Sequence, residues 1–184
     1  MIMAGKSKST KMRKRMTQDR NRTVMIKGKQ VNFVFLGSEA KIPFDKVTSV
    51  SVIPFTKVGD VVAVRNPRGI DIPGGHVQQG ETSIEQVAHR EVGEEAYAKM
   101  DSVEVVDVIQ SDYYGSAPDQ LTYMVIMMGE VSELMPFEVN DETTERQIMP
   151  TQDFLTAYSG GDRGDMEALL KAAIEKRAMG MGGR

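Results

Sequence analysis

Residues 74–95 read Gly-Gly-His-Val-Gln-Gln-Gly-Glu-Thr-Ser-Ile-Glu-Gln-Val-Ala-His-Arg-Glu-Val-Gly-Glu-Glu, and this segment is the most informative part of the chain. Three glycines bracket its first part, where glycine permits positive φ angles and close approach of a ligand to the backbone. Ser83 and Gln86 fit a capping box, as does the pair one residue earlier, and a capping box marks the start of a helix. The pattern predicts a loop followed by a helix from about Ser83 to Met100.

The acidic and apolar residues of this helix share one side. At about 100° per residue, Glu91 and Glu95 fall within the apolar arc and Glu94 lies at its edge. A helix with one solvated face carries its acids opposite the apolar stripe. Like charges at these spacings each cost a few tenths of a kcal/mol (~0.2–0.5), and burial adds to that cost. The spacing therefore indicates that a cation binds these carboxylates.

Three carboxylates at positions i, i+3 and i+4 present hard oxygen ligands along one line, which suits Mg²⁺. Mg²⁺ takes its other ligands from waters and substrate phosphates, so we expect water to attack a phosphoryl group with one glutamate as general base. The alternative interpretation is that Arg90–Glu94 and Glu95–Lys99 form ordinary surface ion pairs. That alternative gives Glu91 no role.

The composition limits the class of protein. A chain of 184 residues fits one domain with a packed core. It contains no cysteine, which excludes disulfides, thiolate metal sites and cysteine nucleophiles. No apolar run approaches the ~20 residues of a membrane span, and the first residues lack a secretory signal. We expect a cytoplasmic protein without a membrane partner.

The charge is distributed unevenly along the chain. Residues 1–30 hold ten Lys or Arg and one acid, whereas the remainder holds 13 basic and 25 acidic residues. We predict a basic, disordered tail over residues 1–22, a folded domain over 23–179 and a frayed glycine-rich end over 180–184. A basic tail can contact nucleic acid weakly, although no aromatic residue interleaves with these charges to stack on bases.

The order of predicted elements indicates an α+β fold. β-branched and aromatic runs bounded by turn residues predict strands, and apolar residues at helical spacing predict a C-terminal helix. Several strands precede the central helix, and more strands and then helices follow it, which favours a mixed-sheet sandwich over strict βαβ alternation. The predicted strands cover residues 31–36, 47–55, 61–64, 70–72, 103–109 and 121–128, and the C-terminal helix covers 166–176.

At the quoted stretch the sequence resembles the Nudix hydrolase family. The family signature is Gly, five residues, Glu, seven residues, Arg-Glu, an aliphatic residue, any residue, Glu-Glu, any residue and Gly. Gly75 to Glu81 matches the first spacing, and residues 90–95 match the central core. Eight residues instead of seven precede Arg90, and Tyr97 replaces the final Gly. The resemblance implies an α/β/α sandwich with a mixed β-sheet.

The resemblance also implies roles for individual residues and a metal cofactor, Mg²⁺ or Mn²⁺. The glutamates of the helix would bind the metal and include the general base, the carbonyl of a loop glycine would add a ligand, and an arginine–glutamate pair would orient the loop. A later loop would supply a further acid. The implied metal ligands are Gly74, Glu91, Glu94 and Glu95, the catalytic set adds Arg90 and Glu81, and the candidates for the later acid are Glu142 and Glu145.

Five further residues are candidates for substrate binding. Arg65 and Arg68 precede the quoted stretch and suit phosphates, and His76 lies within the loop. Tyr113 and Tyr114 follow at a distance where some family members carry an aromatic residue that stacks on a base. Each has a plain structural alternative: a turn for the arginines, solvent exposure for the histidine and packing at a strand end for the tyrosines.

Three functions remain open from the sequence. The first is hydrolysis of a diphosphate linkage in a nucleoside diphosphate derivative, such as a nucleotide, a nucleotide sugar or a dinucleoside polyphosphate. The second is a nucleotide-binding module with weak catalysis. The third is a pyrophosphohydrolase acting on RNA 5′ ends through the basic tail. The resemblance further implies a homodimer, because family members are often dimers.

Overall fold

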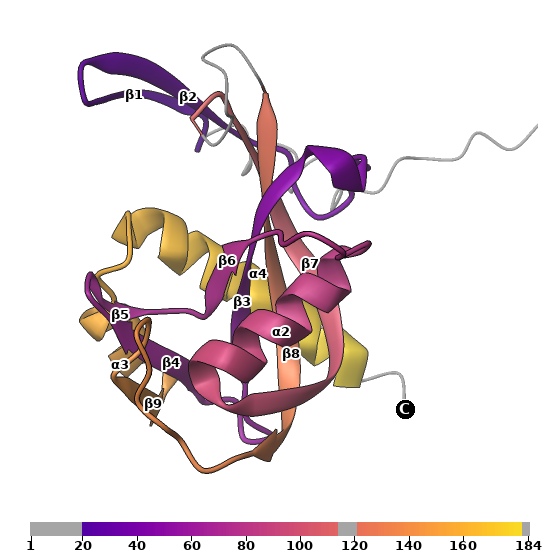
Figure 1. Cartoon of the computed structure of the whole chain (residues 1–184), viewed down its shortest axis with the longest axis vertical. Coiled ribbons are helices and arrows are strands. Elements are labelled where there is room, and N and C mark those ends of the chain that lie inside the picture. Colours follow the sequence, from indigo (N-terminus) through magenta and orange to yellow (C-terminus); the bar gives the residue numbers. More distant parts are fainter. Residues whose placement is uncertain (1–19, 114–120, 182–184) are drawn as a thin grey trace, which may run out of the picture.

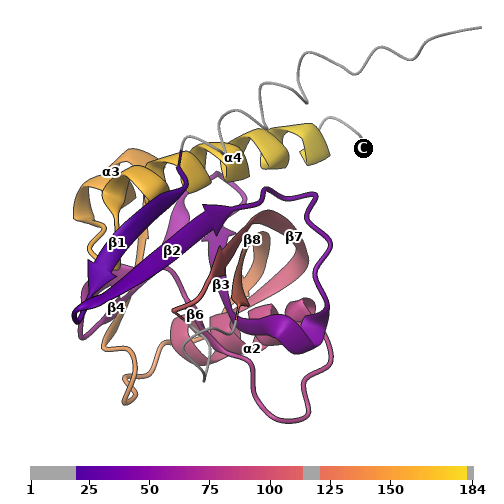
Figure 2. The same cartoon turned by 90° about the horizontal axis from the view of Figure 1, so that it is seen from above.

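The computed structural model describes residues 20–113 and 121–181. Within them, nine strands form one sheet that lies between helix α2 on one face and helices α3 and α4 on the other (Figures 1 and 2). This layered arrangement confirms the predicted α+β sandwich. The strands are β1 (Arg22–Ile26), β2 (Lys29–Phe35), β3 (Val47–Phe55), β4 (Val61–Asn66), β5 (Gly69–Asp71), β6 (Gly74–His76), β7 (Ala98–Ser111), β8 (Thr122–Leu134) and β9 (Glu145–Met149). The helices are the short 3₁₀ turn η1 (Phe44–Lys46), α2 (Ile84–Ala96), α3 (Thr151–Ala157) and α4 (Arg163–Met181).

The sheet is mixed, as the sequence predicts. Its order is β1-β2-β7-β8-β3-β4-β5, while β6 pairs with β3 and β9 pairs with β4. The central strands β3 and β8 run parallel, and the other paired strands are antiparallel. Strand β3 therefore lies at the middle of the sheet and contacts both β8 and the short strand β6, which leads into the loop before α2.

Strand β3 shows how the two faces of the sheet form two cores. Side chains of a strand alternate between faces, so Val50 and Val52 pack toward α2, and Ile53 and Phe55 pack in the cluster with α3 and α4. Burying each such side chain contributes roughly 1.5–3 kcal/mol. The sheet thus holds α2 rigidly against one face, which fixes the residues on that helix.

Helix α2 begins where predicted and ends earlier than predicted. The Ser83 hydroxyl accepts a hydrogen bond from the backbone N–H of Gln86 at 3.3 Å, which confirms the N-cap. The predicted end at Met100 was wrong. Tyr97 adopts a left-handed conformation (φ 48°, ψ 49°) and closes the helix by an N–H bond to the Val92 carbonyl. The next residues, from Ala98 onward, pair with β8.

The two ends of the folded part also differ from the prediction. Arg20 pairs with Asp107, and Arg22 lies in β1 and pairs with Asp165, so residues 20–22 belong to the folded part instead of the expected tail. Residues 1–19 lie outside the described residues. Helix α4 continues through Met181, so residues 180 and 181 are helical where fraying was expected. The remainder of that segment, 182–184, is not described.

Three strands were not predicted from the sequence. Strands β1, β6 and β9 are short, and β6 consists of Gly-Gly-His, which has little strand propensity. Each forms because a neighbouring strand offers a free edge. Within residues 20–113 and 121–181, no helix combines the length and apolar character needed to cross a bilayer.

Candidate active site

The site forms where β6 and its loop meet the first three turns of α2. Pairing of Gly74 with Ser51 of β3 holds the glycine segment flat against the sheet. The Gly74 N–H donates to Glu95 Oε2 at 3.0 Å. A Cβ atom added at Gly75 would lie 2.5 Å from Glu91 Oε1, so only glycine permits this approach. The two glycines therefore bring backbone directly onto the helix carboxylates.

Glu91, Glu94 and Glu95 of α2 differ in burial as the helical wheel predicts. Glu91 is 4 % exposed and Glu95 is 8 % exposed, and both pack among the apolar residues of the helix. The side chain of Glu94 is 53 % exposed. Two buried carboxylates without an equal number of buried cations are unfavourable in a protein interior. This imbalance is typical of a site that binds a cation.

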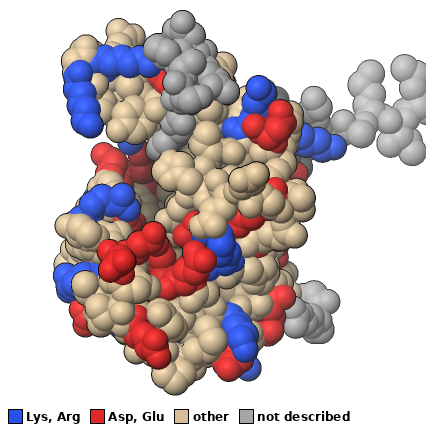
Figure 3. All heavy atoms as spheres, in the orientation of Figure 1, with Lys and Arg blue, Asp and Glu red and all other residues tan. Residues whose placement is uncertain are grey.

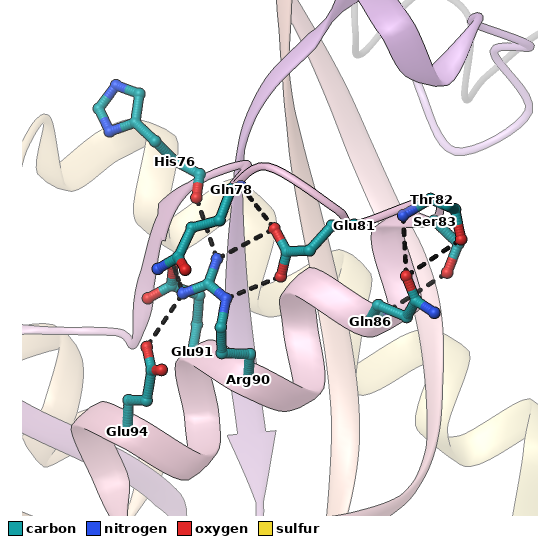
Figure 4. Close-up of polar contacts among 9 residues, drawn as sticks. All are labelled: His76, Gln78, Glu81, Thr82, Ser83, Gln86, Arg90, Glu91 and Glu94. Carbon is teal, nitrogen blue, oxygen red and sulfur yellow. Dashed lines mark hydrogen bonds and ion pairs between the residues drawn. The ribbon is translucent and has the colours of Figure 1, made fainter.

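Arg90 connects the loop to the helix (Figure 4). Its Nε and Nη2 donate to the two carboxylate oxygens of Glu81 at 2.7 and 3.3 Å. Nη2 also donates to the His76 carbonyl at 3.0 Å. Nη1 donates to Glu91 at 2.6 Å and to Glu94 at 3.0 Å. One guanidinium thus fixes the loop, a buried carboxylate and an exposed carboxylate together.

Burial changes the acidity of the two inner carboxyls. The pKa of Glu95 is raised to about 7, mainly by burial and in part by the nearby charge of Glu91. The hydrogen bond from the Gly74 N–H acts in the opposite direction. Burial also raises the pKa of Glu91, and Arg90 opposes this shift. In contrast, Arg90 lowers the pKa of Glu81. The lowered pKa favours the ionised form of Glu81. Burial disfavours the ionised forms of Glu91 and Glu95, which a bound cation would stabilise.

These residues line a cleft of about 530 Å³, which we call the acidic cleft. Figure 3 shows the acidic surface that it presents across the middle of the molecule. Of the two candidates for a later acid, Glu142 lines the cleft, whereas Glu145 forms an exposed ion pair with Arg65 at 2.9 Å. The lining consists of Asn66, Pro67, Arg68, Gly74, Gly75, His76, Gln78, Arg90, Glu91, Glu94, Glu95, Asp141 and Glu142.

The donor set of the acidic cleft fits a hard divalent cation. Its carboxylates are the ligands that Mg²⁺ and Mn²⁺ prefer. Among the described residues, however, no three acidic or histidine side chains already converge in coordinating positions. Arg90 Nη1 engages both Glu91 and Glu94, so Glu94 must turn from Arg90 to share a cation. Its exposure leaves room for that rotation.

The structure brings some of the predicted substrate residues to the cleft and leaves others apart. Arg68 and His76 line it. The His76 imidazole points away from the Arg90 guanidinium (Figure 4). Arg65 lies outside its lining and pairs with Glu145. Tyr113 is exposed at the end of β7 and lines neither the acidic cleft nor the pocket beside it, and Tyr114 lies outside the described residues.

The sequence prediction missed a second cavity of about 410 Å³ beside the cleft. It lies under the β1–β2 hairpin, and we call it the hairpin pocket. Arg68, Gly74, Gly75 and His76 line both cavities, so the two adjoin along these residues. The remaining walls come from distant segments, including Arg22, Phe33, Ser49, Tyr158 and Asp162. No local motif joins such residues, so no sequence signal pointed to this pocket.

The sheet is mixed and lies between helices, and carboxylates of the central helix face a glycine loop. This combination defines a class of α+β proteins whose site acts on phosphate groups. A family model described as the NUDIX domain matches residues 45–169. The chain therefore belongs to the Nudix hydrolase family, whose members cleave phosphoric anhydride bonds. A search of curated proteins finds no match.

Solved structures with this fold are distant in sequence. A mutant of the Bacillus subtilis pyrophosphohydrolase BsRppH has a TM-score of 0.60 and 20 % identity, covering 78 % of this chain and 92 % of that chain. The NUDIX domain of Shewanella oneidensis NrtR, complexed with ADP ribose, has a TM-score of 0.57 and 16 % identity, covering 71 % and 88 %. A NUDIX hydrolase from Nitrosomonas europaea has a TM-score of 0.52 and 19 % identity, covering 73 % and 90 %. At these identities the likeness establishes the fold.

Proposed function

We propose that this protein uses a divalent metal, Mg²⁺ or Mn²⁺, to hydrolyse a diphosphate linkage in a small nucleoside diphosphate derivative. The observation that carries the proposal is the pair of buried carboxylates, Glu91 and Glu95, facing a cleft large enough for a diphosphate. Arg90 is the one cation paired with either carboxylate among the described residues, through Glu91, so the two buried charges are unfavourable unless a metal ion completes the site. The RNA contact of the basic tail and the homodimer remain predictions.

Each residue has a chemical task in this proposal. Glu91, Glu94 and Glu95 would hold the metal with the Gly74 carbonyl, and Glu142, which lines the acidic cleft, would add a further oxygen. The metal, when bound, supplies positive charge that stabilises the phosphoryl group during attack by water. One of the carboxylates accepts the proton of that water.

Three residues outside the metal ligands would hold the substrate and the loop. Arg90 keeps the glycine loop against the helix by its bonds to Glu81, so the carboxylates do not need to be ordered when substrate arrives. Arg68 lines the route between the two cavities, where a phosphate would meet its guanidinium. Such preorganisation lowers the reorganisation needed to reach the transition state.

The test is a metal-dependent hydrolysis screen over nucleoside triphosphates, ADP-ribose, other nucleotide sugars, dinucleoside polyphosphates and 5′-triphosphorylated RNA. It is run with the wild type, Glu94→Gln and the matched exposed control Glu133→Gln. Turnover of a small nucleotide that Glu94→Gln removes and Glu133→Gln retains supports the proposal. Turnover of RNA alone favours the RNA-end hydrolase, and nucleotide binding without turnover favours the binding module.

A further inference from the structure

The hairpin pocket has walls of two chemical kinds. Its sides are apolar and aromatic, with Phe33 of β2 and Tyr158 after α3 on different elements. Its floor is the face of β3 that carries Ser49 and Ser51. Further along the same face, Ile53 and Phe55 belong to the apolar core. Serine thus replaces apolar residues only where β3 meets the pocket.

Ser49 is the polar group that indicates a ligand. The residue is 8 % exposed, and its hydroxyl has no hydrogen-bond partner among the described residues. A buried hydroxyl without a partner costs free energy, because it lost its bonds to water on folding. Ser49 lines the pocket, and its covered hydroxyl would meet a molecule in the pocket after rotation of the side chain about χ1, so an occupant can supply the missing bond.

The roof of the pocket is fixed in place by charge. Arg22 in β1 forms an ion pair with Asp165 of α4, and its guanidinium lies 5.8 Å from the centroid of the Phe33 ring. This ion pair joins β1, near the start of the described chain, to α4, near its end, and so holds the hairpin over the pocket. Figure 3 shows the hollow that the hairpin overhangs. The hairpin precedes residue 45, so this wall lies outside the part of the chain that matches the family model.

The lining selects one kind of occupant. Its charged side chains are largely paired with one another, Asp165 with Arg22 and Asp71 with Arg68, and Asp162 adds a further acid, so the described lining offers a phosphate no unpaired cation. A purely hydrocarbon group would leave the Ser49 hydroxyl unpaired. A flat aromatic group that carries N–H donors and ring acceptors satisfies the serine and the acids and stacks against Phe33. A nucleobase has this chemistry.

We propose that the hairpin pocket binds the base of the nucleotide substrate, with Phe33 stacking on the base and the Ser49 hydroxyl bonding to its edge. This assignment rests on the proposed function, because the diphosphate must extend past Gly74 and Gly75 into the acidic cleft. The four residues shared by the two cavities form that passage. Ser49 is thus a specificity residue, distant from the reacting bond.

Calorimetric titration in Mg²⁺ buffer tests the assignment. The probes are AMP, GMP, CMP and UMP, with ribose 5-phosphate as the probe that lacks a base. The proteins are the wild type, Ser49→Ala and Ser102→Ala, which changes an exposed serine of β7. For the nucleotide that binds the wild type best, Ser49→Ala weakens affinity about fivefold, the value of one neutral hydrogen bond. Ribose 5-phosphate binds both equally, and Ser102→Ala behaves as wild type.

Thermal unfolding separates recognition from structure. Because the Ser49 hydroxyl has no hydrogen-bond partner within residues 20–113 and 121–181, Ser49→Ala leaves the melting temperature unchanged or raises it. A lowered melting temperature with unchanged affinities overturns the assignment. So does the absence of nucleoside monophosphate binding to the wild type, or an equal loss for ribose 5-phosphate. Base-dependent affinity without hydrolysis in the screen would instead remove the proposed function and retain the pocket.

Discussion

The acidic cleft and the hairpin pocket lie side by side but are built in different ways. Most of the cleft residues lie between positions 66 and 95, on the turn after β4, on β6 with its loop, and on α2. The pocket takes its walls from β1, β2, β3, β7, β8 and the segment around α4. The cleft is therefore the product of local sequence, and the pocket is the product of tertiary packing. This difference is typical of enzymes whose chemistry is common to a family while recognition varies.

The two regions should also differ in kinetic role. Residues of the acidic cleft act on the reacting bond, so changing them lowers kcat. Residues of the hairpin pocket hold a part of the substrate that does not react, so changing them raises KM.

Glu94→Gln gives the largest expected effect. The exposed side chain has a single ion-pair partner, so the fold tolerates the change, but the site loses a metal ligand or base. We expect kcat to fall at least about a hundredfold. Steady-state kinetics beside Glu133→Gln, another exposed glutamate in an ion pair, measures this effect. Equal activity of both variants would contradict the assignment of the cleft.

Arg90→Lys should rank second. Lysine keeps the charge but loses the planar fork that bonds Glu81 twice and reaches two carboxylates of the helix. We expect activity to fall roughly tenfold to a hundredfold, as for other groups that orient metal ligands. The control is Arg65→Lys, since Arg65 makes an exposed pair with Glu145. If Arg90→Lys is no worse than Arg65→Lys, Arg90 does not organise the loop.

Phe33→Ala tests the recognition role of the hairpin pocket. Loss of a ring that stacks on a base raises KM about tenfold and leaves kcat nearly unchanged. Phe33→Tyr keeps the ring and retains KM near the wild-type value. A fall in kcat instead of a rise in KM would show that the hairpin takes part in the chemistry.

Gly75→Ala places a methyl group against the Glu91 carboxylate, 2.5 Å from Oε1, so the carboxylate must move. A displaced ligand should lower kcat roughly tenfold. The matched control is Gly93→Ala on α2, where an added Cβ meets no atom of the described residues within 4 Å. Because alanine favours a helix, that control should raise stability by about 0.5–1 kcal/mol and keep full activity.

Glu95→Gln should alter the pH dependence of stability in metal-free protein. The pKa of Glu95 is about 7 in the folded state, above its ordinary value of 4.5, so the wild type loses stability progressively as pH rises from 4.5 to about 7. Glutamine stays neutral, so the variant should gain on the order of 1 kcal/mol over wild type at pH 8 and little at pH 4. Urea unfolding with a chelator present measures this. An equal difference at both pH values would contradict the shifted pKa.

The α+β architecture and the helix residues of the acidic cleft could be predicted from the sequence. The capping serine, the glycine loop and the positions of Glu91 and Glu95 within the apolar arc all follow from local spacing, and the structure confirms them. The end of α2 did not follow, because tyrosine rarely adopts a left-handed cap. Contact of the Tyr97 ring with Phe137, at 5.4 Å between centroids, helps to hold it there.

The missed features share a physical cause. Strands β6 and β9 have weak propensity and form only because β3 and β4 offer edges. The hairpin pocket forms where Phe33, Ser49 and Tyr158 come together in the fold. These residues lie far apart along the chain, so no local pattern predicts that they share a cavity. The tyrosines proposed for stacking were chosen by distance from the motif, and Tyr113 lies on neither cavity.

The most direct test of the account is a kinetic cycle with Glu94→Gln, Ser49→Ala and the double variant, using the best nucleotide from the hydrolysis screen. We expect Glu94→Gln to lower kcat and Ser49→Ala to raise KM about fivefold. The two free-energy effects should add in the double variant, because the residues act at separate regions. A loss of kcat from Ser49→Ala, or full turnover by Glu94→Gln, would contradict the division between chemistry and recognition.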